Sequence, residues 1–198
     1  REYLEHYEDR FWLFHPERPF YQVAGLDRGT DYSAAKLNGE LAESGNKSNL
    51  FSSRSGKAKS RLTYAEAARW LLHINGFDDA SGKPSVRKMN LPSPGVGWLG
   101  KLGLVIAVGN NLFETLMLNL TLLRDGTACW EPGEAVWERE EVRRDERCEI
   151  AQPGNPAELL TLQSRRILLQ RQSGMVIGYK LLGGDFFPEE NAFHAQMT

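Results

Sequence analysis

Residues 44–61 combine side chains that can bind phosphates and bases. The stretch has five basic residues and no acidic one, and its other residues are mostly serine, glycine and asparagine. The basic residues are Lys47, Arg54, Lys57, Lys59 and Arg61. Lysine and arginine gain affinity for nucleic acid because phosphate binding releases condensed counterions. Phe51 can stack on an unpaired base or wedge into a duplex, so the stretch is a candidate nucleic-acid contact.

An apolar pair in the same stretch, Leu50 and Phe51, allows two interpretations. Either the pair anchors a long loop in the core, or it stays exposed and contacts a ligand. Long loops in compact domains are usually functional or disordered. Since only this pair can hold residues 44–61, we expect them to be disordered in the isolated chain.

Signals for catalysis or metal binding are weak elsewhere. Residues 79–84 resemble a phosphate-binding loop, but Gly76 and Gly82 are one residue too far apart and Pro84 replaces the hydroxyl that holds magnesium. The four histidines lack metal-pair spacing, and Cys129 and Cys148 supply only two ligands. No nucleophile elbow is present. We therefore expect no enzyme, no metal and no cofactor.

Charged clusters near the C-terminal half favour structural roles. Glu138, Glu140 and Glu141 are expected to form a solvated face, because charge runs usually do. Arg165 and Arg166 are expected to face an acidic neighbour such as this cluster. A hydrolase would need a convergent acid–base or metal pair, which the sequence does not show.

Composition indicates a globular α+β domain. The chain has 198 residues, of which 41% are hydrophobic and 25% charged, with a net charge of −2. This near balance argues against a bulk polyanion binder.

The longest apolar run, 104–108, is far shorter than the ~20 residues of a membrane helix, so no membrane partner is expected. The charged start indicates a fragment without a signal peptide, and the two cysteines favour a cytoplasmic protein.

Periodicity predicts two elements clearly. Residues 63–74 form a helix that begins with a Thr63–Glu66 capping box and stops at Asn75-Gly76, with Ala67, Ala68, Leu71 and Leu72 buried. Residues 159–170 and 175–182 form an antiparallel hairpin around a turn at 172–174.

Further elements are predicted from periodicity and residue types. We expect a helix end at 1–10, a weak helix at 32–43, a buried strand at 102–108 and a helix at 111–124. Residues 10–23 are expected to be irregular, with their aromatic side chains in a core. Those side chains are Phe11, Trp12, Phe14 and Phe20. Helices and strands mixed without regular alternation make the fold α+β, in one domain over 1–198.

Several short motifs, in this order, resemble the CasA family, the large subunit of the type I-E CRISPR Cascade surveillance complex. They are Arg10-Phe11-Trp12-Leu13-Phe14, Pro19-Phe20-Tyr21-Gln22, Ser44-Gly45-Asn46 with Leu50-Phe51, the helix at 65–72, Gly97-Trp98-Leu99-Gly100, residues 109–116, Leu118-Asn119-Leu120, Trp130-Glu131 and residues 162–167.

The resemblance implies most of a mixed α/β N-terminal domain, without the C-terminal four-helix bundle. It implies a non-catalytic subunit that recognises the protospacer-adjacent motif of double-stranded target DNA and contacts the 5′ handle of the guide RNA. Its expected partners are these nucleic acids, the other Cascade subunits and the nuclease-helicase that the complex recruits.

The resemblance also assigns contact residues. The loop that touches the guide RNA maps to Asn49, Leu50, Phe51, Ser52 and Ser53, which lie between the basic residues Lys47 and Arg54. The glycine-rich loop at the motif maps to Ala80, Ser81, Gly82 and Lys83, and the lysine finger to Lys180. Only Gly82 is glycine in the mapped loop, and the glutamine wedge of the family would lie beyond Thr198. The alternative is a structural or protein-interaction domain without nucleic-acid contact.

Overall fold

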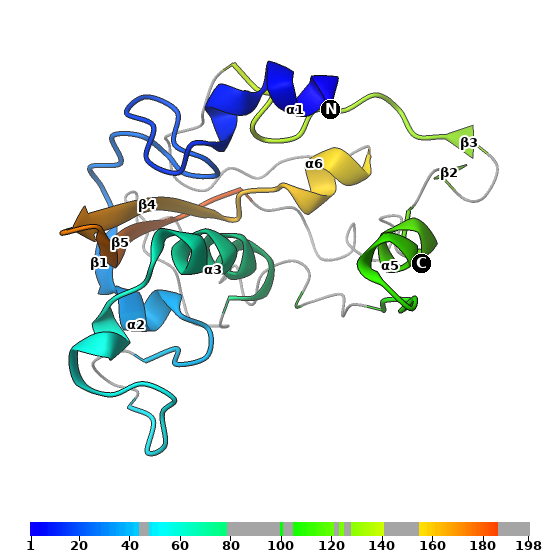
Figure 1. Cartoon of the computed structure of the whole chain (residues 1–198). Helices are drawn as coiled ribbons and strands as arrows, with labels where there is room; N and C mark the ends of the chain where they lie inside the picture. The colour runs from blue at the N-terminus through cyan, green and yellow to red at the C-terminus, as the bar shows by residue number, and fades with distance from the viewer. Residues whose placement is uncertain are drawn as a thin grey trace, which may run out of the picture.

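A three-stranded antiparallel sheet lies at the centre of the structure, with the strand order β1-β5-β4 (Figure 1). Its strands are β1 (Thr30–Ser33), β4 (Arg165–Gln172) and β5 (Met175–Gly183). This computed structural model describes residues 1–43, 48–78, 100, 105–120, 123–124, 128–140 and 155–185. The sheet and its flanking helices give the α+β fold that the sequence predicts.

The predicted hairpin is confirmed as β4 and β5, which pair from Arg165↔Gly183 to Gln172↔Met175. Its turn residues, Ser173 and Gly174, both have positive φ, at 50° and 75°. That backbone fits a two-residue type I′ turn, whose twist matches that of paired strands.

The first strand was predicted to begin too early, at residue 159. Residues Pro156–Leu160 instead form the short helix α6. The side chain of Asn155 caps it by accepting a hydrogen bond from the Glu158 N–H, and proline opens its first turn. Both features favour a helix start over a strand.

Helix α3 (Tyr64–Phe77) confirms the predicted helix and its Thr63–Glu66 capping box, but it continues past Asn75 and Gly76. Asn75 is buried and ties the helix to the sheet. Its side-chain oxygen accepts from the Arg165 N–H at 3.1 Å, and its carbonyl accepts from the Ser164 hydroxyl at 2.8 Å. The residue predicted to end the helix therefore packs it against the start of β4.

The main hydrophobic core lies between α3 and the sheet. Ala67 and Leu71 are buried as predicted, whereas Ala68 is half-buried and Leu72 is exposed, because the helix contacts the sheet along a narrower stripe than expected. The buried members of this core are Tyr21, Ala34, Leu37, Leu62, Ala67, Leu71, Ile74, Ile167, Leu169, Val176, Tyr179 and Leu181. A second, smaller cluster holds Val23, Leu26 and Leu182.

The N-terminal segment lies above the sheet in Figure 1, opposite α3. It begins with α1 (Glu2–His6) and the 3-10 helix η1 (Glu8–Phe11) and continues as irregular chain. Phe14 and Phe20 pack against the core, but Trp12 is exposed, which corrects its predicted burial. Trp12 instead stacks edge-on against His15.

Several other predicted elements are partly wrong. Residues 32–43 do not form one helix: β1 takes the first two, and α2 (Ala34–Leu37) is a single turn. Pairing of β1 with β5 is close, since a Cβ on Gly178 would lie 2.5 Å from the Tyr32 carbonyl oxygen.

The predicted buried strand at 102–108 is also wrong where the structure describes it. Residues 105–108 are irregular and exposed. Asn111 caps the next helix as expected, but α5 (Leu112–Leu118) is shorter than predicted and its apolar side chains are exposed. Leu123 belongs instead to the two-residue strand β2 (Leu123–Arg124), which pairs with β3 (Ala128–Cys129). Among the described residues, no helix is long and apolar enough to cross a membrane.

Candidate nucleic-acid interface

Residues 48–55 form an irregular segment that extends away from the sheet at the lower left of Figure 1, between α2 and the 3-10 helix η2 (Gly56–Ser60). At its tip Leu50 is 94% exposed and Phe51 is 95% exposed. These values contradict the interpretation of the pair as a core anchor. Two large apolar side chains are therefore held in solvent on a projecting segment, which we call the tip (residues 50–53).

One side of this segment is fastened to the end of the preceding loop. The Asn49 side chain donates to the Leu41 carbonyl at 2.5 Å, and the Asn49 N–H donates to the Glu43 carboxylate at 3.1 Å. The same carboxylate forms an ion pair with Lys59 at 2.8 Å. Glu43 thus joins both legs of the segment, and the hydrogen bond from Lys59 lowers the pKa of its carboxyl.

The other side is fastened to α3. Arg54 forms an ion pair with Glu66 at 2.5 Å and donates to the Arg61 carbonyl at 3.3 Å. Glu66 also accepts the Thr63 N–H at 2.8 Å as part of the capping box. Hydrogen bonding from the Thr63 N–H, with Arg54 next, lowers the pKa of Glu66 to about 2.

The segment then joins the sheet at Leu62. The N–H and carbonyl of Leu62 pair with those of Val176, each hydrogen bond measuring 2.9 Å. Leu62 is fully buried. The contacts of Asn49 with Glu43, of Arg54 with Glu66 and of Leu62 with Val176 therefore hold the base of the tip, while Leu50 and Phe51 at its end are almost fully exposed.

The charge of this region is lower than its sequence suggests. Arg54 and Lys59 are paired with Glu66 and Glu43, which lie just outside the acid-free stretch. Lys57 and Arg61 are exposed, and neither forms an ion pair within the described part of the chain. Lys47 lies outside the described residues. Two exposed cations thus follow the tip in the chain, Lys57 in η2 and Arg61 just before Leu62.

The other residues predicted to contact nucleic acid lie partly on the tip, partly on the sheet and partly outside the described residues. The Ser52 hydroxyl accepts from the Arg54 N–H at 3.3 Å, and Ser53 is exposed. Lys180 lies in the central strand β5 and pairs with Asp31 of β1 at 2.9 Å. The hydrogen bond from Lys180 lowers the pKa of Asp31. Ala80, Ser81, Gly82 and Lys83 lie outside the described residues.

Sequence reasoning missed the two carboxylates that hold the tip. Glu43 was placed in a helix and Glu66 was identified only as a cap. Glu43 directly precedes the basic stretch and Glu66 is the first acidic residue after it, which is a usable signal, because opposite charges at the ends of a loop can pair with its cations.

Arg165 and Arg166 face acidic neighbours, as expected, but these neighbours are not the Glu138 cluster. These side chains are buried and pair with Asp78 at 3.1 Å and Asp185 at 2.6 Å. Glu138 instead accepts hydrogen bonds from the Tyr3 hydroxyl and the Ala135 N–H. Within the described ranges, no group of three or more histidine, cysteine, aspartate or glutamate residues could hold a metal ion.

Comparison with known proteins decides the family. A model of the CRISPR-associated protein Cse1 family matches residues 1–197. The chain belongs to the Cse1 family. Cse1 and CasA are two names for one family, as a curated relative from Thermus thermophilus shows by carrying both. That protein is 38% identical over 133 residues, which cover 66% of this chain and 26% of the relative.

Solved Cse1 structures share the fold. Thermobifida fusca Cse1 has a TM-score of 0.78 and 31% identity, covering 94% of this chain and 36% of its own. A chain in a structure titled as a CRISPR RNA-guided surveillance complex in a pre-nicking state has a TM-score of 0.68 and 25% identity, covering 92% of this chain and 36% of its own. This Cse1 chain thus spans between about a quarter and somewhat over a third of these relatives' lengths.

Proposed function

We propose that this chain contacts nucleic acid through its tip as part of a CRISPR RNA-guided surveillance complex. In this proposal the tip meets the 5′ handle of the guide RNA and the protospacer-adjacent motif of target DNA. The subunit then helps to recruit the nuclease-helicase. Membership in the Cse1 family supports the setting, since a similar chain occurs in a structure titled as such a complex.

The observation that carries the proposal is the exposure of Phe51 on a fastened base. A free apolar side chain on a mobile loop would gain by folding back onto the core, because burial of apolar area is favourable. Here the latches at Asn49 and Arg54 hold the tip outward. An aromatic ring held in this way is ready to stack on a base. Stacking tolerates any base, which suits a complex in which pairing with the guide RNA supplies the sequence specificity.

The neighbouring cations supply the second part of the interaction. Lys57 and Arg61 can reach phosphates on either side of a stacked base, whereas Arg54 and Lys59 serve mainly to shape the segment. Reading of the motif by Gly82 and its neighbours belongs to the same proposal. Lys180 can take part only by exchanging Asp31 for an acceptor in the minor groove.

The proposal is tested by duplex binding of the assembled complex carrying Phe51→Ala. Loss of a stacked base costs ~1–3 kcal/mol, which corresponds to about a 5- to 150-fold loss of affinity. Trp12→Ala is the matched control, because Trp12 is also an exposed aromatic residue but lies on the N-terminal segment across the sheet. Equal affinities for the two variants and the parent complex would contradict the proposal.

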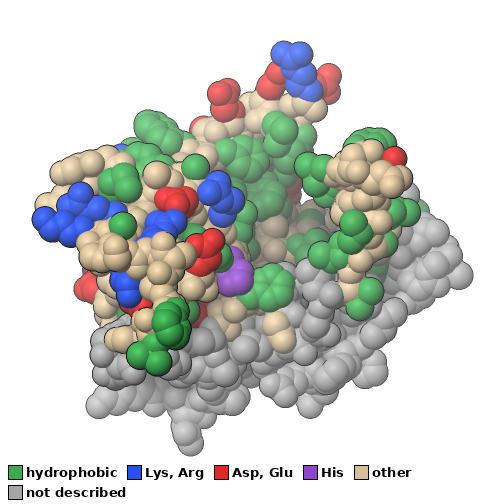
Figure 2. All heavy atoms as spheres, turned by 60° about the horizontal axis from the view of Figure 1, so that its bottom comes forward, with side chains coloured by type: hydrophobic (Ala, Val, Ile, Leu, Met, Phe, Trp, Pro, Cys, Tyr) green, Lys and Arg blue, Asp and Glu red, His purple; other side chains and the backbone are tan. Residues whose placement is uncertain are grey.

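A protein-contact role has separate support from α5. Figure 2 shows hydrophobic side chains along the protruding α5 at the right. Leu112 and Phe113 are 74% and 71% exposed, and exposed apolar patches mark contact sites. We propose that α5 faces protein partners in the complex. Phe113→Ala should then weaken the pull-down of other protein subunits, whereas Phe51→Ala should weaken binding of the guide RNA and the duplex.

A further inference from the structure

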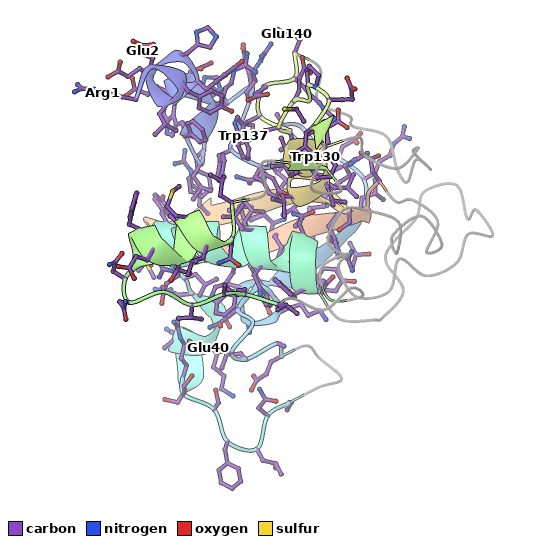
Figure 3. The ribbon with its side chains drawn as sticks, turned by 90° about the vertical axis from the view of Figure 1, so that its right-hand side faces the viewer. Arg1, Glu2, Glu40, Trp130, Trp137 and Glu140 are labelled. Atoms are coloured by element: carbon purple, nitrogen blue, oxygen red, sulfur yellow. The ribbon has the colours of Figure 1, made fainter. Side chains whose placement is uncertain are left out.

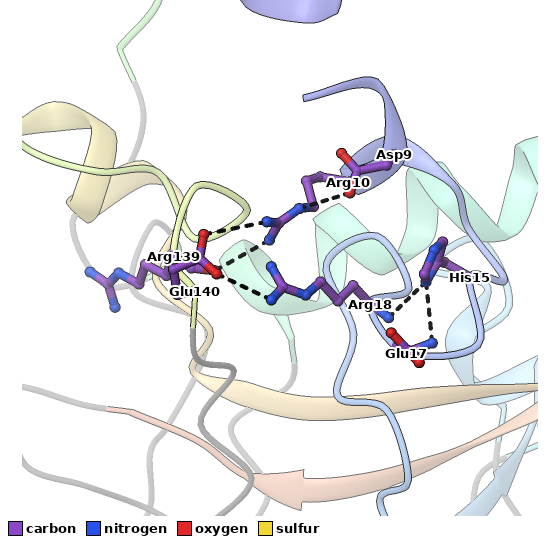
Figure 4. Close-up of polar contacts among 7 residues, drawn as sticks. All are labelled: Asp9, Arg10, His15, Glu17, Arg18, Arg139 and Glu140. Atoms are coloured by element: carbon purple, nitrogen blue, oxygen red, sulfur yellow. Dashed lines mark hydrogen bonds and ion pairs between the residues drawn. The ribbon is translucent and has the colours of Figure 1, made fainter. Parts of the chain in front are cut away.

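Four arginines line a cavity beneath the N-terminal segment. Figure 4 shows two of them, Arg10 and Arg18, directed toward the carboxylate of Glu140. Arg10 and Arg18 come from that segment, Arg139 from the loop after β3, and Arg166 from β4. The cavity measures about 40 Å³, whereas a water molecule needs ~10–15 Å³ by the same kind of measure. The space therefore admits a group larger than one water.

One exposed carboxylate holds the rim of this cavity together. Glu140 accepts from Arg18 at 3.2 Å and lies 3.7 Å from Arg10, so it bridges the two guanidinium groups. Its side chain is 81% exposed. Ion pairs of this exposure are weak and easily exchanged, because water screens them. Glu140 is therefore a counter-ion that another anion can replace.

The arginines are held at different depths. Arg166 is 1% exposed and paired with Asp185 at 2.6 Å, which fixes the floor. Arg10 also contacts Asp9 at 3.1 Å and donates to the Arg139 carbonyl at 3.4 Å. The guanidinium groups of Arg10, Arg18 and Arg166 thus meet the carboxylates of Asp9, Glu140 and Asp185, so an anion that displaces Glu140 takes over its charge pairing with Arg10 and Arg18.

One buried donor in this group is unsatisfied. The Arg18 Nη1 is shielded from solvent and has no hydrogen-bond partner among the described residues. Buried polar groups without partners are rare and call for a ligand, a water or an ion. The guanidinium fork also matches the oxygen spacing of phosphate, to which arginine donates in pairs.

We propose that this cavity binds a phosphate group, with Arg18 as a principal donor and Glu140 as the counter-ion that the phosphate displaces. The site is distinct from the tip. In Figure 3, Glu140 lies at the top of the molecule, whereas Glu40, which precedes the tip in the chain, lies near the bottom. The proposal therefore stands independently of the nucleic-acid contact at Phe51.

Isothermal titration calorimetry of the full chain with inorganic phosphate tests this site. Arg18→Gln should weaken binding by roughly tenfold or more, as expected for loss of a charge-assisted hydrogen bond. Glu140→Gln should strengthen binding, because it removes the competing carboxylate. Arg28→Gln is the matched control, since Arg28 is exposed, pairs with its neighbour Asp27 at 4.0 Å and does not line the cavity.

The source of the phosphate is distinguished by a second titration with a short RNA that lacks terminal phosphates. If inorganic phosphate binds more tightly than the RNA, the site is assigned to a phosphate monoester. If the RNA binds more tightly, the site is assigned to backbone phosphate. Either assignment requires that Arg18→Gln weakens binding of the ligand concerned. If Arg18→Gln lowers the melting temperature and so disturbs the fold, the phosphate affinity of Glu140→Gln relative to the parent chain alone tests the proposal. No saturable binding by the parent chain and Glu140→Gln, or equal affinity for Arg18→Gln and Arg28→Gln in folded proteins, overturns the proposal.

Discussion

The guanidinium of Arg54 lies 2.5 Å from the carboxylate of Glu66, and this contact ties the exposed tip to the first turn of α3. Glu66 has two tasks, because the same carboxylate closes the capping box with Thr63. The placement of Phe51 therefore depends on how α3 begins. Variants of Glu66 can separate the two tasks.

Glu66→Gln should release the tip without removing the cap. Glutamine completes a capping box as glutamate does, but it carries no charge for Arg54. Glu66→Ala should lose both, with about 1 kcal/mol from the cap alone. Urea unfolding should show Glu66→Ala as the less stable variant, while limited proteolysis near the tip should increase in both. Equal stability of the two variants would show that the capping bond contributes nothing measurable.

The depressed pKa of Glu66 predicts an acid-dependent loss of stability. The ordinary pKa of 4.5 falls to about 2 in the folded chain, so the folded state favours the ionised carboxylate. Its contribution is complete above the ordinary pKa and is lost as the pH falls from about 4.5 through about 2.

Unfolding free energies of the parent chain and Glu66→Gln should therefore converge over that pH range. Glu43, whose pKa is lowered by Lys59, changes in the same direction in both proteins. A constant difference between parent and variant down to the lowest pH would contradict this account.

The buried ion pair between Arg166 and Asp185 should be expensive to break. Asp185→Ala leaves a guanidinium that is 1% exposed without its carboxylate, and such losses cost about 3–5 kcal/mol. Asp27→Ala removes the exposed pair with Arg28 and should cost less than about 1 kcal/mol. Chemical denaturation measures both, and similar values for the two variants would argue against the buried pair.

Lys57 and Arg61 should set part of the salt dependence of nucleic-acid binding. Replacing both with glutamine should reduce the slope of log affinity against log salt by about two, since each phosphate contact contributes nearly one. Arg28→Gln in the same complex is the control. An unchanged slope for the double variant would place these cations away from phosphates.

The sequence predicted the parts of the fold whose signals are local. The α3 start follows from Thr63 and Glu66, and the hairpin turn follows from Ser173-Gly174. Asn75-Gly76 failed as a helix end because contacts of Asn75 with Ser164 and Arg165, distant in sequence, outweigh the local preference. Element ends depend on such tertiary contacts more than element starts capped by side chains do.

The sequence was less informative where burial had to be known. An apolar pattern does not say which surface covers it, so residues 105–108 were expected to be buried and are exposed, as are the apolar side chains of α5. The candidate interface was half predictable. The residue types around Phe51 predicted the candidate stretch. The ion pairs of Glu43 with Lys59 and of Glu66 with Arg54 could be seen only in the structure, because each joins residues distant in sequence. The arginine cavity draws on three separate segments, which no local pattern connects.

Photo-crosslinking at position 51 tests the central claim most directly. Phe51 would be replaced by benzoylphenylalanine in the assembled complex bound to labelled guide RNA and target duplex. We expect the crosslink to form with nucleic acid, because the side chain is 95% exposed and lies on a segment that extends away from the sheet. The same replacement at Phe113 should crosslink to protein. Crosslinks from position 51 to protein alone would contradict the account and leave the tip as a subunit contact.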